Sequence, residues 1–283
     1  MKRIEPDELK QLELDILDYV AKFCDEHEIT YWLDFGTLIG AIRHKGYIPW
    51  DDDIDISMMR ADYNKFIKLF TSAQTGKYKM RCMENDPNCG LLFGKIRNTE
   101  TLLFDHQKIS GEPNTLKIKA NKHLGVYIDI FIYDNAPEDD NELKKIFRKR
   151  NFYRKITQLR TKKRRPQGNF FRRTCSYAVR LLSKIIFSPL PINYFAKKAA
   201  KIFQKYELFP AKCVACFTTS YSAAIDKHVF DSFIDVDFEG RKYKAPSGYD
   251  ELLRAYYGDY MQLPPVEERT SKHELTAYMI NSD

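Results

Sequence analysis

The sequence contains no run of eighteen apolar residues, and it therefore predicts no transmembrane helix. Its first residues, MKRIEPDELKQ, are charged and have no apolar stretch behind them, unlike a secretory signal. Cysteine is sparse, with six in 283 residues, and the one close pair, Cys213 and Cys216, lacks the second pair that a zinc site would need. From these absences we expect a cytoplasmic protein with reduced thiols.

Acidic residues are absent from Leu143 to Tyr206, a stretch that holds 20 Lys or Arg. The whole chain has 46 basic and 39 acidic residues, so the remainder has 26 basic and 39 acidic residues and a charge of −13. The net charge of +7 therefore conceals two surfaces of opposite sign. The basic surface should face an anionic partner, which could be a phospholipid layer, nucleic acid or an acidic glycan.

Hydrophobic residues make up 43% of the chain, enough for the core of one large domain or two small ones. Apolar spacing of three to four residues predicts helices, and strict alternation predicts strands. The predicted helices are 7–27, 38–44, 60–70 and 249–258, and the predicted strands are 31–35, 53–57, 78–83, 91–98, 126–134 and 233–245. This order of elements indicates an α/β or α+β fold.

The chemically most informative stretch is the acidic motif DDDID at 51–55. Because side chains alternate along a strand, Asp53 and Asp55 should project from one face with Cα atoms about 7 Å apart. Two such carboxylates raise each other's pKa, and a divalent cation removes that penalty. Hard oxygen ligands select Mg²⁺ or Mn²⁺. A solvated acidic turn leading into an edge strand is the alternative explanation.

Two further features favour a metal site for phosphoryl transfer. Asp129, on the predicted strand 126–134, could supply a third carboxylate as a metal ligand or as a base for an acceptor hydroxyl. Gly36 and Thr37 form a small-residue turn between a strand and a helix, where backbone N–H groups can approach a phosphate closely. Asp51 and Asp52 precede the alternation and stay ambiguous between orienting a metal-bound water and capping the loop.

Four segments together resemble a known family. They are LDFGTLIGAIRHKGYIPWDDDIDISMMRADYNKF (33–66), KIRNTETLL (95–103), GVYIDIF (125–131) and KAPSGYDELLRAYYGDYMQLPPVEERTSKH (244–273). They are similar to the LicD family of phosphotransferases, which includes fukutin-like proteins. Together they cover about a third of the chain and lie on both sides of the basic segment.

The resemblance implies an α+β fold: a nucleotidyltransferase-like mixed sheet flanked by helices, with a basic helical insertion. It divides the chain into a catalytic core at 1–142, a basic and mainly helical segment at 143–206 and a C-terminal part at 207–283 that completes the catalytic domain. Within this fold, Gly36 and Thr37 match the family's turn, and Asp53 and Asp55 match its Asp-x-Asp pair. Asp129 matches the carboxylate of a later strand.

The resemblance also implies an activity. Family members transfer a phospho-alcohol from a CDP-linked donor, such as CDP-choline, CDP-glycerol or CDP-ribitol, to a sugar hydroxyl of a cell-surface glycan or its lipid-linked precursor. CMP would be released. The alternatives are a nucleotidyltransferase that releases pyrophosphate and a non-catalytic scaffold at a membrane. The intact Asp-x-Asp pair argues against the scaffold.

Basic residues near the motifs could hold the donor diphosphate. These are Arg43, His44 and Lys45 at the end of the helix 38–44, and Lys95 and Arg97 on one face of a strand. Helix-dipole complementarity is the alternative for the first three, and solvent-exposed strand charge is the alternative for the other two.

Aromatic and polar residues could line a nucleotide or acceptor pocket. Trp50 could stack on the base or cover the core. Tyr249, Tyr257, Asp259 and His273 belong to the C-terminal resemblance and could contact substrate, although buried aromatics with satisfied hydroxyls are commoner.

The basic segment has a sequence typical of an interfacial amphipathic helix at 170–187, FFRRTCSYAVRLLSKIIF. Interleaved aromatic and basic residues also suit nucleic acid, but no recognition module accompanies them, so we expect no specific nucleic-acid partner. A solvated positive face is the third interpretation. Since the family's glycan acceptors are commonly built on lipid carriers, we expect peripheral binding to the anionic inner face of the cell membrane.

Overall fold

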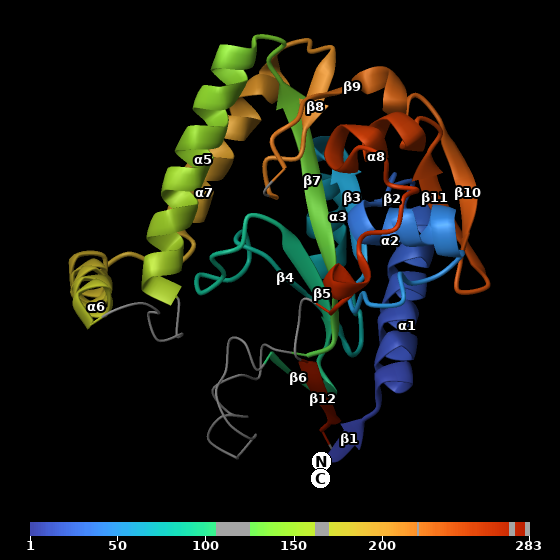
Figure 1. Cartoon of the computed structure of the whole chain (residues 1–283), viewed down its shortest axis with the longest axis horizontal. Helices are drawn as coiled ribbons and strands as arrows, with labels where there is room; N and C mark the ends of the chain where they lie inside the picture. Colours follow the sequence, from blue (N-terminus) through green and yellow to red (C-terminus); the bar gives the residue numbers. More distant parts are fainter. Residues whose placement is uncertain (106–124, 162–169, 220, 272–274, 281–283) are drawn as a thin grey trace.

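The computed structural model describes residues 1–105, 125–161, 170–219, 221–271 and 275–280 (Figure 1). At its centre is a mixed β-sheet whose main path has the strand order β2-β3-β7-β5-β4. These strands are β2 (Trp32–Leu33), β3 (Asp55–Met59), β7 (Tyr127–Ala136), β5 (Gly94–Asn98) and β4 (Tyr78–Arg81). Strands β3 and β7 are parallel, and the other neighbours on this path are antiparallel. The expected α+β class is confirmed.

Helices α1 (Pro6–Glu26) and α3 (Arg60–Ser72) pack on the central sheet. Helix α1 begins with proline at its first turn, followed by Asp7 and Glu8, which suit the positive end of the helix dipole. Its buried face repeats every three to four residues, as the sequence predicted, and contacts β5 and β7. Helix α3 contributes Tyr63, Phe66 and Phe70 to the same core.

The C-terminal part of the chain returns to strands from the first half. Strand β8 (Cys213–Ala215) pairs with β7 and with β9 (Ile225–Asp226). Strand β12 (Leu275–Met279) pairs with β1 (Lys2–Ile4) and β6 (Thr101–Asp105), so the first and last strands lie together (Figure 1). The hairpin β10 (Phe233–Phe238) and β11 (Arg241–Pro246) precedes helix α8 (Tyr249–Tyr257).

The basic segment contains three helices: α5 (Asp140–Thr161), α6 (Phe170–Ile186) and α7 (Tyr194–Gln204). Helices α5 and α7 pack together around a second hydrophobic cluster that includes Phe147, Ala199 and Phe203. Helix α6 contacts α5 and lies away from the central sheet (Figure 1). The predicted break at 188–193 separates α6 from α7, whereas the predicted break at 164–169 lies outside the described residues.

Short helical turns complete the chain. A π-helical turn, Gly40–His44, continues helix α2 (Phe35–Ile39), and three 3₁₀ turns span Lys205–Leu208, Lys227–Phe230 and Val266–Glu268. Over the described residues, every helix is too short or too polar to cross a lipid bilayer. All six cysteines are free thiols.

Two element boundaries near the acidic motif differ from the sequence prediction. Strand β3 begins at Asp55 rather than at residue 53, because residues 51–53 still belong to a loop in which the Asp51 N–H donates to the Ile48 carbonyl at 2.8 Å. The predicted strand 31–35 is reduced to Trp32–Leu33, because Asp34 caps helix α2 by accepting a hydrogen bond from the Phe35 N–H. Strands β1, β6 and β12 were not predicted.

Candidate active site

Three charged side chains form a row across the central sheet. Asp55 on β3 lies directly opposite Asp129 on β7, and Asp129 lies directly opposite Lys95 on β5. Directly opposed residues project from the same face of a sheet. The Lys95 ammonium pairs with the Asp129 carboxylate and lies over the Tyr127 ring, 3.4 Å from its centroid. Three of the predicted site residues are therefore neighbours.

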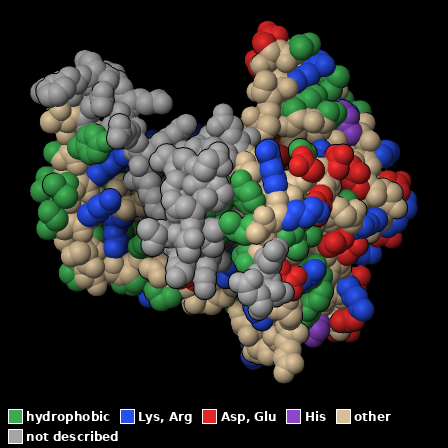
Figure 2. All heavy atoms as spheres, turned by 90° about the horizontal axis from the view of Figure 1, so that it is seen from below, with side chains coloured by type: hydrophobic (Ala, Val, Ile, Leu, Met, Phe, Trp, Pro, Cys, Tyr) green, Lys and Arg blue, Asp and Glu red, His purple; other side chains and the backbone are tan. Residues whose placement is uncertain are grey.

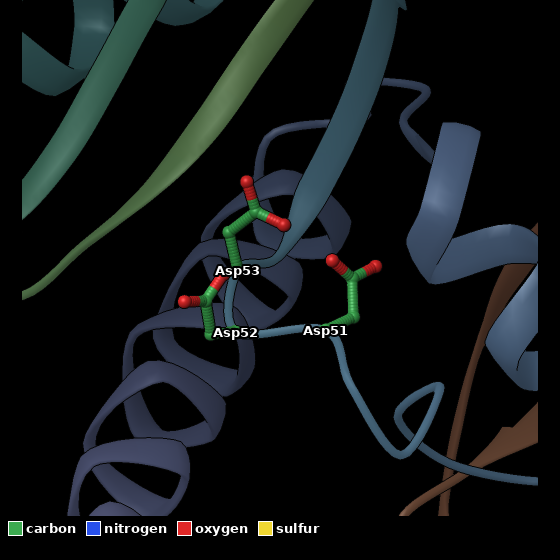
Figure 3. Close-up of side chains that lie close together, drawn as sticks. All are labelled: Asp51, Asp52 and Asp53. Atoms are coloured by element: carbon green, nitrogen blue, oxygen red, sulfur yellow. The ribbon is translucent and has the colours of Figure 1, made fainter. Parts of the chain in front are cut away.

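The loop before β3 adds three more carboxylates. Asp51, Asp52 and Asp53 each present an oxygen within 4.8 Å of the others (Figure 3). The Ser271 hydroxyl donates to Asp52 at 2.6 Å, which ties this loop to the C-terminal part of the chain. The predicted pairing of Asp53 with Asp55 on one strand is thus wrong in detail, since Asp53 belongs to the loop cluster.

The crowded charges act on the carboxyl group of Asp55. Burial, followed by the charges of Asp53, Asp129 and Asp51, holds the pKa of Asp55 well above its usual value, and Lys95 offsets this only in part. The row and the loop therefore bring several carboxylates close together. An all-carboxylate set of hard oxygens fits Mg²⁺ or Mn²⁺.

Gly36 and Thr37, predicted as a turn before a helix, lie in the first turn of helix α2 and pack directly against both parts of this acidic group. The Thr37 hydroxyl accepts a hydrogen bond from the Asp55 N–H at 2.8 Å, so it fixes the start of β3. A Cβ atom on Gly36 would lie 2.4 Å from a carboxylate oxygen of Asp51. The glycine thus lets the loop carboxylate approach the backbone, and the threonine holds the strand.

Asp34 directly precedes helix α2 and was not predicted as a site residue. It accepts hydrogen bonds from the hydroxyls of Ser57 at 2.6 Å and Tyr133 at 2.9 Å, and Tyr256 in turn donates to Tyr133. Burial raises the pKa of Asp34 to about 6, although these hydrogen bonds lower it. Its position before a helix is the signal that could have identified it, since aspartate is a preferred N-cap.

An aromatic group lies beside the carboxylates. Phe35 stacks on Tyr221, with ring centroids 5.3 Å apart, and Tyr221 stacks on Tyr256 at 4.8 Å and contacts Tyr257 at 5.3 Å. Burial, together with the charges of Asp55 and other aspartates, raises the pKa of Tyr221. The three tyrosines are half-buried, so their rings are partly accessible.

Phe35 has a backbone φ of 47°, in the left-handed region that a phenylalanine rarely adopts. Such strain persists where surrounding contacts enforce it, and it concentrates at functional sites. Of this aromatic group, the sequence had indicated only Tyr257. With 18 Tyr and 19 Phe in the chain, aromatic abundance gave no signal for the others.

The structure also places four predicted basic and aromatic residues beside the acidic loop. They are Arg43, His44, Lys45 and Trp50. The Arg43 guanidinium donates to the backbone carbonyl of Tyr260 and to the His44 ring, the latter at 2.9 Å. The His44 ring meets the Trp50 ring edge-on at 6.4 Å. Lys45 is exposed and ends the π-helical turn with a φ of 61°. Arg43 thus joins this turn to the C-terminal part of the chain.

The remaining predicted residues are more dispersed. Arg97 lies two positions beyond Lys95 on β5, and burial lowers its pKa, with the charge of Arg81 acting in the same direction. Tyr249 begins α8 and is half-buried, and Asp259 is exposed just after that helix. His273 lies outside the described residues.

The family described as LicD/FKTN/FKRP, nucleotidyltransferase domain, matches residues 28–166, which include the acidic loop and the row. The chain is 30% identical over 285 residues to lipopolysaccharide cholinephosphotransferase LicD of Haemophilus influenzae, covering 99% of this chain and 100% of that protein. It is 41% identical over 44 residues to ribitol 5-phosphate transferase FKRP of Homo sapiens, or 16% of this chain and 9% of that protein.

Proposed function

This chain belongs to the LicD family, and we propose that it transfers a phospho-alcohol, with phosphocholine as the favoured group, from a CDP-linked donor to a sugar hydroxyl. The acceptor would be a cell-surface glycan or its lipid-linked precursor. The observation that carries this proposal is the row Asp55–Asp129–Lys95 beside the three loop carboxylates. Cholinephosphotransferase and ribitol-phosphate transferase activities in the named relatives support the same reaction class.

We assign the metal to oxygens of Asp51, Asp53 and Asp55, with Asp129 as a further ligand or as the base, and with Asp52 held by Ser271. Mg²⁺ or Mn²⁺ bound there would neutralise the donor diphosphate and the charge that develops on the leaving group. The contact with Lys95 orients the Asp129 carboxylate across from Asp55. Thr37 and Gly36 fix the strand and the loop from which these carboxylates project.

In the proposed reaction, the sugar oxygen forms a bond to the phosphorus that carries the alcohol. The phosphoanhydride bond breaks, and its electron pair leaves with CMP. The proton of the sugar hydroxyl passes to a carboxylate of the row, for which Asp129 is the candidate.

The aromatic group favours a choline headgroup on the donor. A quaternary ammonium group is bound by the faces of aromatic rings through cation–π contact. Tyr221 and Tyr257 are half-buried, contact each other and lie within the electrostatic influence of Asp55. In the proposed complex these rings would contact the alcohol of a donor whose diphosphate lies at the carboxylates.

The test is a donor panel of CDP-choline, CDP-glycerol and CDP-ribitol, incubated with the purified chain, Mn²⁺ or Mg²⁺ and a lipopolysaccharide acceptor, with products identified by mass spectrometry. We expect CMP release and a phosphocholine-modified acceptor, both of which EDTA abolishes. Pyrophosphate release from CTP would instead indicate a nucleotidyltransferase. Failure to bind both Mn²⁺ and every CDP-alcohol in calorimetry would indicate a non-catalytic protein.

A further inference from the structure

Helix α6 presents more large apolar side chains to solvent than any other described helix or strand. Their exposed fractions lie between 48% and 64%. They are Tyr177, Val179, Leu181, Leu182, Ile185 and Ile186. Exposed apolar groups of this density on one element mark an interaction surface.

These six side chains share one side of the helix. At 3.6 residues per turn they span an arc of about 200°, and no charged residue between Thr174 and Ile186 falls within it. Arg180, Ser183 and Lys184 occupy the remaining arc. Ser183 is only 6% exposed and Arg180 is half-buried, so this side of the helix faces the protein, with the exposed Lys184 at its margin, and the apolar arc faces outward.

The described helices of the lobe that carries α6 are positively charged. Exposed basic side chains lie on α5, which contacts α6, and on α7, which packs on α5: Lys144, Lys145, Arg148, Lys149, Arg154 and Lys155 on α5, and Lys197, Lys198 and Lys201 on α7. Figure 2 shows hydrophobic and basic side chains on the lobe at left, which holds these helices, and most of the visible acidic side chains on the other side.

We propose that α6 docks this protein on an anionic lipid bilayer, with the helix lying in the interface, its apolar arc among the acyl chains and the flanking Lys and Arg at the headgroups. A wide apolar arc on a basic helix, too polar to span the bilayer, is the pattern of interfacial helices. A second copy of this chain fits poorly, because pairing the same lobe would bring the exposed Lys and Arg of two copies together.

The proposal does not depend on the proposed transferase activity, because no residue of α6 belongs to the candidate active site. It names a cytoplasmic surface that would hold the chain beside a lipid-borne acceptor. The two ideas can fail separately: an inactive Asp55→Asn protein should still bind vesicles, and a protein that does not bind vesicles could still modify a soluble acceptor.

The experiment is flotation of the full-length chain with vesicles of phosphatidylcholine, with or without phosphatidylglycerol. The test variant is Leu181→Asp with Ile185→Asp, which places two charges in the apolar arc. The matched control is Leu208→Asp with Val266→Asp, because these apolar residues are 81% and 72% exposed but lie on other elements. Circular dichroism checks that both variants are folded.

We expect the wild type and the control to float with anionic vesicles, and the α6 variant to lose vesicle binding by at least about tenfold. High salt should weaken the binding of the wild type. Undiminished flotation of the α6 variant, or equal flotation with purely neutral vesicles, would overturn the proposal. A second result would also overturn the proposal: light scattering, without lipid, that shows the wild type as a dimer and the α6 variant as a monomer. In that case α6 would be a contact between copies of the chain.

Discussion

Asp55 and Asp129 lie directly opposite each other on the parallel strands β3 and β7. Two carboxylates at neighbouring positions in a sheet repel, and here the loop acids add to that repulsion. The folded chain therefore holds several like charges close together. A bound cation would make the same arrangement favourable, so stability and activity should respond in opposite directions when these charges are removed.

Asp55→Asn is the first prediction. Removing a buried carboxylate that is crowded by like charges should leave the melting temperature unchanged or raise it. The turnover number should fall by about 10²–10³-fold, as is typical when one preorganised electrostatic contact is lost. Thermal unfolding and CMP release measure the two effects.

The matched control for Asp55→Asn is Asp235→Asn, which changes an exposed aspartate on β10. It should alter neither quantity appreciably. If Asp55→Asn lowers the melting temperature and keeps full turnover, then Asp55 is a structural group and not part of the site.

Lys95→Met, the second prediction, removes the ammonium that pairs with Asp129. The Asp129 carboxylate then stays 7% exposed beside Asp55 without that partner, so we expect a loss of up to about 3 kcal/mol in the free energy of unfolding. Adding Asp129→Asn to the Lys95→Met protein should recover most of the lost free energy of unfolding but none of the activity.

Urea unfolding of the two single variants and the double variant forms a cycle that measures the coupling between Lys95 and Asp129. If the losses of unfolding free energy in the two single variants add up to the loss in the double variant, the contact between Lys95 and Asp129 has no coupling energy.

Some of the site could be predicted from sequence because its signals are local. Alternation identified the strands that carry Asp55 and Asp129, and a short run of small residues identified the Gly36–Thr37 turn. Asp53 was placed on the wrong element, because alternation continues across 53–57 in the sequence while strand pairing begins at Asp55. Where a strand starts depends on its hydrogen-bonding partner, and one strand's sequence does not contain that information.

Other features could not be predicted because they depend on long-range register. Lys95 and Arg97 look equivalent in sequence, but only the register of β5 against β7 places Lys95 opposite Asp129. Tyr221 reaches the site from a segment without regular structure, where no periodicity marks it. Strands β1 and β12 were missed for the same reason, because each is short and is stabilised by pairing with a strand far along the chain.

Gly36→Ala is the third prediction, and it tests the close approach of Asp51. The new Cβ would lie 2.4 Å from the Asp51 carboxylate oxygen, and this flexible side chain can move away. We therefore expect a small change in stability but weaker Mn²⁺ binding in calorimetry, by about tenfold. In an Asp51→Ala background, the same Gly36→Ala change should have no further effect on Mn²⁺ affinity. An equal effect in both backgrounds would contradict this explanation.

Thr37→Val, the fourth prediction, removes the hydroxyl that accepts from the Asp55 N–H at 2.8 Å while keeping the shape of the side chain. A buried N–H without an acceptor should cost about 1–3 kcal/mol of unfolding free energy, measured with urea. Thr37→Ser is the matched control, because it keeps the acceptor and should retain most of the stability and activity. A Thr37→Val protein as stable as Thr37→Ser would show that this hydrogen bond contributes little.

Glu13→Gln is the last prediction, and it concerns pH. Glu13 on α1 is buried, accepts a hydrogen bond from the Tyr47 hydroxyl at 3.0 Å and has a pKa held well above its ordinary 4.5, chiefly by burial. The folded state keeps this proton at pH values where the unfolded state releases it. The contribution of Glu13 to the free energy of unfolding is therefore greatest below pH 4.5. It falls as pH rises toward the folded pKa, by up to about 1.4 kcal/mol per pH unit. Glutamine keeps an acceptor for Tyr47 but cannot ionise. Glu13→Gln should therefore gain stability relative to wild type between pH 5 and pH 8 in urea unfolding. Glu26→Gln, an exposed change on the same helix, should keep the wild-type dependence of stability on pH. Parallel pH profiles for Glu13→Gln and wild type would show that Glu13 is ionised in the folded protein.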